Sequence, residues 1–70
     1  MKYIISEHLN GEPLYRDYIT VKNLTRAKVY ATKNRKRNDT LLTIQDTNGN
    51  YLASKRGGRW INDHRFSEMH

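Results

Sequence analysis

KNLTRAKVYATKNRKR, residues 22–37, decides the fold, because here the apolar residues recur with a helical period. Leu24, Ala27, Tyr30 and Ala31 fall within a narrow arc of a helical wheel, which is the stripe that a helix needs to pack on a sheet. The two alanines allow a close approach between helix and sheet. We therefore predict a helix over residues 24–37, with Asn23 or Thr25 as its N-cap.

The same stretch carries seven lysines and arginines and no acidic residue. Charge runs of this kind often only solubilise a helix end. Here the cations repel one another unless something neutralises them, and a second basic cluster surrounds the last predicted turn. Two such clusters in a short chain favour an anionic partner, and nucleic acid, an acidic protein surface or an anionic membrane would each be attracted. A membrane is not among the expected partners. The candidate contacts to the anionic partner are Lys33, Arg35, Lys36, Arg37, Lys55, Arg56 and Arg59.

Short β-forming segments lie on both sides of the helix. The clearest is TLLTIQD, where Leu42 and Ile44 share one face of a strand. Asn48-Gly49 is typical of a type I′ hairpin turn, and Gly57-Gly58 favours another turn. Asn10-Gly11 and Pro13 mark an irregular loop, so a long-looped hairpin is expected near the N-terminus. The predicted strands are Lys2–Glu7, Asp17–Lys22, Thr40–Asp46, Tyr51–Lys55 and Arg59–Asn62.

This order of elements, β-β-α-β-β-β, predicts the α+β class. Hairpin connections at both ends favour a single antiparallel sheet of about five strands with the helix on one face. The other sheet face is then at least partly open. We expect a single domain over residues 1–70, with an ordered core over residues 2–62 and a loose tail over residues 63–70.

Composition limits the possible functions. The 70 residues include no cysteine, carry a formal net charge of +6, and have a pI of about 9.9. Neither a membrane span nor a signal peptide is visible, so a cytoplasmic protein is expected. The acidic residues and histidines are scattered singly, without the convergent spacing that catalysis or metal binding requires. We predict no catalytic residue, no metal site and no cofactor.

Polar and aromatic residues of the C-terminal strands are candidates for a protein-binding surface on the sheet. Aromatic side chains often anchor interfaces, but a tryptophan in a small domain is more often part of the core. The sequence leaves both roles open for the single tryptophan. The candidate protein contacts are Gln45, Tyr51 and Trp60.

Several short segments together resemble one family, the small phage-encoded anti-CRISPR proteins that inhibit type I-F systems. The similarity covers most of residues 2–61, and residues 40–60 contribute most to it. The matching segments are Tyr3-Ile4-Ile5, Leu24-Thr25-Arg26-Ala27-Lys28, Leu42-Thr43-Ile44, Asn48-Gly49, Tyr51-Leu52-Ala53 and Gly58-Arg59-Trp60.

The resemblance implies an inhibitor without enzymatic activity that binds the crRNA-guided surveillance complex (Csy or Cascade). Its expected partners are the backbone subunits along the DNA channel, where it would block hybridisation of target DNA in the host bacterial cell. Some relatives also promote non-specific binding of double-stranded DNA through basic residues. The alternatives are a small basic β-sheet DNA-binding module of phage or plasmid origin, and a phage or plasmid protein that binds some other acidic protein.

Overall fold

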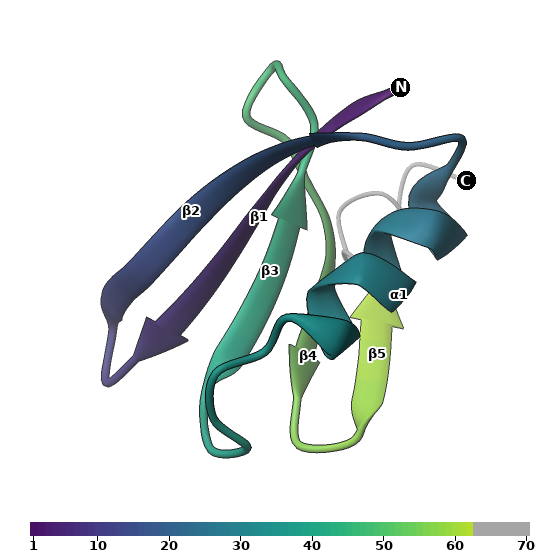
Figure 1. Cartoon of the computed structure of the whole chain (residues 1–70). Helices are drawn as coiled ribbons and strands as arrows, with labels where there is room; N and C mark the ends of the chain where they lie inside the picture. The colour runs from purple at the N-terminus through teal and green to yellow at the C-terminus, as the bar shows by residue number, and fades with distance from the viewer. Residues whose placement is uncertain (63–70) are drawn as a thin grey trace.

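The computed structural model describes residues 1–62, and the predicted tail over residues 63–70 lies outside them. Five antiparallel strands form one sheet in the order β2-β1-β3-β4-β5, with a single helix against one face (Figure 1). The predicted α+β fold is confirmed. No helix among residues 1–62 is long and apolar enough to cross a bilayer. The elements are β1 Lys2–Leu9, β2 Glu12–Thr20, α1 Leu24–Lys33, β3 Leu41–Gln45, β4 Tyr51–Arg56 and β5 Arg59–Asn62.

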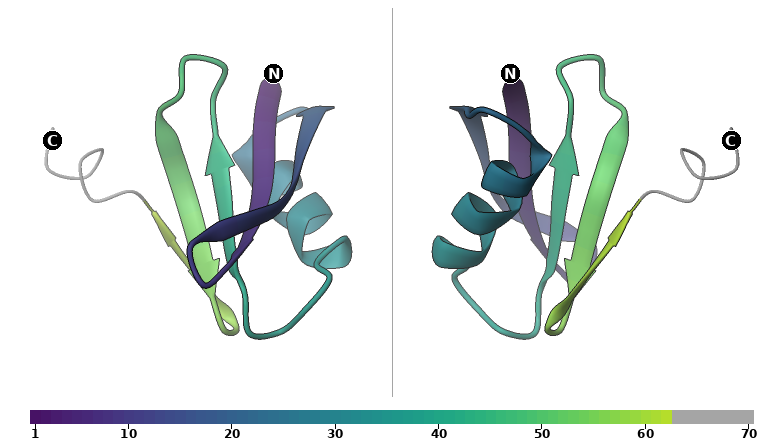
Figure 2. Two further views of the ribbon diagram at one scale, coloured as in Figure 1. Left: turned by 90° about the vertical axis from the view of Figure 1, so that its left-hand side faces the viewer. Right: turned by 90° about the vertical axis from the view of Figure 1, so that its right-hand side faces the viewer.

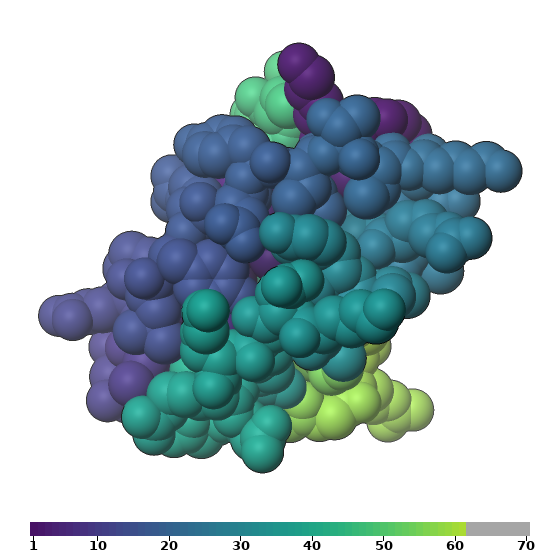
Figure 3. Space-filling model, viewed as in Figure 1, coloured from purple at the N-terminus to yellow at the C-terminus, as the bar shows by residue number. Residues whose placement is uncertain are grey.

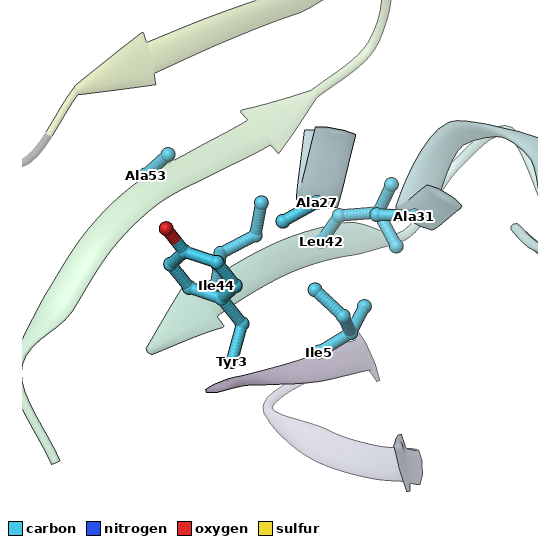
Figure 4. Close-up of a cluster of buried hydrophobic side chains, with 7 residues drawn as sticks. All are labelled: Tyr3, Ile5, Ala27, Ala31, Leu42, Ile44 and Ala53. Atoms are coloured by element: carbon cyan, nitrogen blue, oxygen red, sulfur yellow. The ribbon is translucent and has the colours of Figure 1, made fainter. Parts of the chain in front are cut away.

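The core lies between the helix and the central strands (Figure 4). Ala27 and Ala31 are fully buried against the sheet, and Leu24 and Tyr30 pack at its edge, so the predicted apolar stripe is confirmed. Leu42 and Ile44 share the helix-facing side of β3, again as predicted. The opposite face of the sheet is left uncovered by the helix, as two side views show (Figure 2). The buried core residues are Tyr3, Ile5, Ala27, Ala31, Leu42, Ile44 and Ala53.

The small size of Ala27 sets the distance between helix and sheet. We expect Ala27→Leu to destabilise the fold by about 1–3 kcal/mol, because three additional carbon atoms have no space at a fully buried position. Urea unfolding monitored by circular dichroism measures the change. Val29→Leu on the exposed side of the same helix is the matched control and should be neutral. Equal midpoints for the two variants would show that the interface is not closely packed.

The first hairpin differs from the prediction. The strands β1 and β2 are longer than expected and meet at a two-residue turn, Asn10-Gly11, whose φ values of 53° and 83° suit a type I′ turn. The predicted loop is therefore mostly strand. Pro13 is tolerated because β2 is an edge strand and a register shift occurs opposite it, at Glu7/His8.

The second Asn-Gly pair also behaves differently from the prediction. In the β3–β4 turn only Gly49 has a positive φ, 87°, so this is not the predicted type I′ turn. Asp46 organises it instead, since its Oδ1 accepts from the backbone amides of Asn48 and Asn50, both at 2.9 Å. These hydrogen bonds with Asn50 and Asn48 lower the pKa of Asp46.

The helix begins where the sequence predicts and ends earlier. Asn23 is the N-cap, and its Oδ1 accepts from the Arg26 amide at 3.0 Å. The prediction that the helix extends to Arg37 is wrong, because α1 ends at Lys33. The amides of Lys36 and Arg37, which would continue the helix, donate instead to the Glu7 carboxylate at 2.8 and 3.0 Å. Asn34 caps the helix, because its amide and its Nδ2 both donate to the Tyr30 carbonyl, and Glu7 holds the residues that follow.

Candidate functional site

The two predicted basic clusters form one end of the molecule. The loop after α1 and the β4–β5 turn lie side by side along the lower edge in Figures 1 and 3. The Arg35 Nη1 donates to the Gly57 carbonyl at 2.8 Å and joins the two segments directly. We call the exposed cations here the basic end. They are Lys33, Lys36, Arg37, Arg56 and Arg59.

Two of the predicted contacts differ from the others in being half-buried and engaged within the chain. The Arg35 guanidinium binds carbonyl groups on both sides of the junction. Lys55 donates to the Thr32 hydroxyl at 3.2 Å and lies over the Trp60 ring at 5.6 Å. Neither side chain projects freely, so the five residues of the basic end offer the more accessible charges.

The carboxylates near the basic end are held by the protein's own donors. Glu7 is fully buried and accepts from Thr40 as well as from two loop amides. Asp39 forms a two-pronged ion pair with Arg37, 2.8 Å in each contact. By contrast, Lys33, Lys36, Arg56 and Arg59 form no ion pair with a carboxylate of residues 1–62. The fold thus leaves a positive surface here that attracts anions.

The pKa values at this end reflect that arrangement. Burial acts to raise the pKa of Glu7, but hydrogen bonds from Thr40, Lys36 and Arg37 outweigh it and lower the pKa. Burial and the adjacent Glu7 raise the pKa of Tyr15 to about 12. The hydrogen bond from Arg37 lowers the pKa of Asp39 to about 2. These carboxylates therefore stay ionised at neutral pH.

The uncovered face of the sheet holds two of the three predicted protein contacts. Gln45 and Tyr51 are paired across β3 and β4, and a bulge at this point places Leu52 against the core. The same cross-strand row continues through Ile4 to Tyr18 on β2. Tyr51 and Tyr18 are 44% and 72% exposed, so this row presents two aromatic side chains to solvent. We call the row Tyr18, Ile4, Gln45 and Tyr51 the open-face row.

Trp60 does not belong to the open-face row. It is half-buried, packs against the core, and pairs with Lys55 on the helix-facing side of the sheet. The ammonium groups of Lys28 and Lys55 lie 5.9 and 5.6 Å from its ring centroid. Trp60 therefore lies on the other face of the sheet from Gln45 and Tyr51, where it packs against the core.

Two residues that shape the basic end were not found by sequence reasoning. These are Glu7 and Thr40, which anchor the loop after α1 to β1 because the Thr40 hydroxyl donates to the Glu7 carboxylate. A signal was present in the first strand, where Tyr3, Ile5 and Glu7 alternate on one face. A carboxylate on an apolar, core-facing strand position predicts a buried acid with several hydrogen-bond donors nearby.

Comparison with known proteins shows which of them share this sequence and fold. No family model and no curated protein matches the sequence. Among solved structures, the chain is similar to AcrIF9, with 35% sequence identity and a TM-score of 0.75. The similarity covers 90% of this chain and 88% of AcrIF9.

That agreement in sequence and fold, over nearly the whole of both chains, defines the class of protein. The class is the anti-CRISPR proteins directed against type I-F systems. Within it, the chain belongs to the AcrIF9 family. The resemblance seen in the sequence is confirmed, and an anti-CRISPR role implies binding to a CRISPR–Cas complex.

Proposed function

We propose that the protein is a non-enzymatic inhibitor that binds the type I-F crRNA-guided surveillance complex along its DNA-binding channel. It would contact the backbone subunits, block hybridisation of target DNA, and hold double-stranded DNA non-specifically through the basic end. It would act inside the host cell, where that complex works. The observation that carries the DNA part is the basic end, where four cations are exposed without an ionic partner among residues 1–62.

Electrostatics argues for two separate binding surfaces. A channel that binds DNA is itself basic, so a protein with a net charge of +6 is repelled unless it docks through a weakly charged area. The open-face row supplies such an area, because Tyr18, Ile4, Gln45 and Tyr51 are all uncharged. The β3–β4 turn and the β4–β5 turn lie at opposite ends of the sheet (Figure 1). Docking near Tyr51 would therefore leave the basic end available to DNA.

Capture of the complex tests the proposal. Immobilised protein should retain purified type I-F surveillance complex, and the captured complex should fail to bind a matched target duplex. It should still retain an unrelated duplex at low salt, with retention decreasing as salt rises. Failure to capture the complex, or normal target binding by the captured complex, would contradict the inhibitory mechanism.

We expect Tyr51→Ala to weaken capture of the surveillance complex by about tenfold or more, since an exposed aromatic residue is a common interface anchor. Val29→Ala, which truncates a residue of similar exposure on the outer side of the helix, is the control. Calorimetry or biolayer interferometry with purified complex measures both. Equal affinities for the two variants would remove the open-face row from the interface.

A stand-alone DNA-binding module is the second candidate, and the exposed cations of the basic end favour it too. Mobility shifts of duplex DNA with the isolated protein separate the two. Tight binding near physiological salt without any protein partner would favour the module. Binding that is strong only at low salt, or only in the presence of the surveillance complex, would favour the inhibitor.

A further inference from the structure

Arg35 differs from every residue of the basic end in how its charged group is used. Its guanidinium donates to the carbonyls of Asn38 and Thr40 at 3.1 and 2.5 Å, and Nε lies 3.4 Å from the Thr40 hydroxyl. Another nitrogen donates to the Gly57 carbonyl at 2.8 Å. All of these acceptors are uncharged. Arg35 is therefore bound on several sides while its positive charge is retained.

These contacts bridge two segments that adjoin paired strands, because Leu41 of β3 pairs with Arg56 of β4 next to them. Asn38 and Thr40 lie in the loop after α1, and Gly57 lies in the β4–β5 turn, 22 positions from Arg35. A planar guanidinium has five N–H donors in a fixed fork, so it can bind both segments at once. A lysine ammonium, a point donor on a flexible stem, cannot reproduce that geometry.

The bridge fixes how the two basic segments face a ligand. Lys33 and Lys36 are carried on one side of it, and Arg56 and Arg59 on the other. Glu7 holds the loop independently from β1, through the amides of Lys36 and Arg37, and its hydrogen bonds within residues 1–62 do not reach the turn. Arg35 is thus the side chain that links loop and turn directly. A surface arranged before binding loses less conformational entropy when it binds.

We propose that Arg35 is a positioning residue that joins the two basic segments into one continuous surface for a phosphate backbone, without itself contacting phosphate. The inference rests on the proposed function, in which the basic end binds DNA. With Arg35 in place, both segments engage the same duplex at once, and binding of one raises the effective concentration of the other. Without it, the loop can shift relative to the turn, and the two segments no longer face the duplex as one surface.

The first test compares Arg35→Lys with Lys33→Gln in duplex binding measured by fluorescence anisotropy over a range of KCl concentrations. Lys33→Gln removes one exposed charge, so the slope of log K against log [salt] should fall by about 1. Arg35→Lys keeps the charge, yet we expect about a tenfold loss of affinity and a fall in slope of about 2, because one segment disengages. Arg35→Lys with wild-type affinity and slope would overturn the proposal.

A second measurement does not depend on a variant that must fold. In the ¹⁵N NMR spectrum of the wild-type protein, the arginine Nε–H signals of Arg56 and Arg59 should shift on titration with a short duplex. The Nε–H of Arg35, held by Thr40, should stay in place. Equal shifts for Arg35 and Arg59 would show direct phosphate contact and overturn the positioning role. If neither the wild-type protein alone nor the surveillance complex with this protein bound retains DNA, the proposed DNA role is wrong, and this inference is wrong with it. If both retain DNA and Arg35→Lys behaves like the wild type, only this inference is wrong.

Discussion

Replacing Lys36, Arg56 and Arg59 together with glutamine should weaken non-specific retention of duplex DNA by roughly 100-fold, and reduce the salt slope by about 2.7 if each residue contacts one phosphate. All three side chains are exposed, and none is ion-paired with a carboxylate of residues 1–62. The reason is that each phosphate contact releases condensed counterions from DNA. Anisotropy titrations at several salt concentrations, with the protein alone and with its surveillance complex, measure both quantities.

The control for that variant must change net charge by the same amount at another place. Lys2, Lys22 and Arg26 are likewise exposed, and they lie near the first residues of β1 and α1, at the other end of the molecule (Figure 1). Their triple glutamine variant should retain most of the DNA affinity. If both variants lose affinity equally, net charge rather than the basic end governs DNA retention. If neither loses it, DNA is held elsewhere.

The comparison also separates the two proposed surfaces. The open-face row contains none of the three substituted residues, so capture of the surveillance complex should be unchanged in the basic-end variant. Target DNA should remain excluded from the captured complex if occlusion is the inhibitory step. Loss of capture in this variant would show that Lys36, Arg56 or Arg59 contacts the complex directly, and that the two surfaces are not separate.

Much of the fold could be predicted because its determinants are local. The stripe of Leu24, Ala27 and Ala31 fixes the buried side of the helix, and Leu42 with Ile44 fixes that of β3. These patterns need no knowledge of what lies opposite. The class of fold follows from them, because a short chain with one such helix and several alternating strands has few ways to bury both.

The errors arose where distant residues decide a local conformation. Asn34 is the C-cap of the helix, but an asparagine inside a basic run is a weak local signal. The path of the chain beyond it is set by Glu7, which lies 29 and 30 positions before the amides that it binds. Pro13 looked like a strand breaker because its place on an edge strand depends on the order of strands in the sheet. The same limit applies to the candidate site, where contacts between distant residues decide what each side chain does. Arg35 could be recognised as basic, but its bond to Gly57 depends on the folded structure.

Glu7→Ala should be the most destabilising single substitution considered for this protein, at about 3 kcal/mol. Removal of the carboxylate leaves the amides of Lys36 and Arg37 and the Thr40 hydroxyl without their buried acceptor. For a domain of this size the melting temperature should fall by more than about 10 °C. Glu12→Gln, which removes an exposed charge from β2, is the control and should change stability by less than about 0.5 kcal/mol.

The pH dependence of the unfolding free energy is an independent test of how the Glu7 carboxylate stabilises the fold. The pKa of Glu7 in the fold is below its ordinary value of 4.5, so the ionised form is bound more tightly by the folded chain than by the unfolded one. Its contribution is therefore complete above pH 4.5 and is lost as the pH falls through the lower, folded-state pKa. Asp39 and Asp46 are shifted in the same direction, so the wild-type curve alone does not isolate Glu7. The difference in unfolding free energy between wild type and Glu7→Gln should therefore shrink as the pH falls below 4.5. A difference that stays constant down to pH 2 would mean that Glu7 acts through packing and not through its charge.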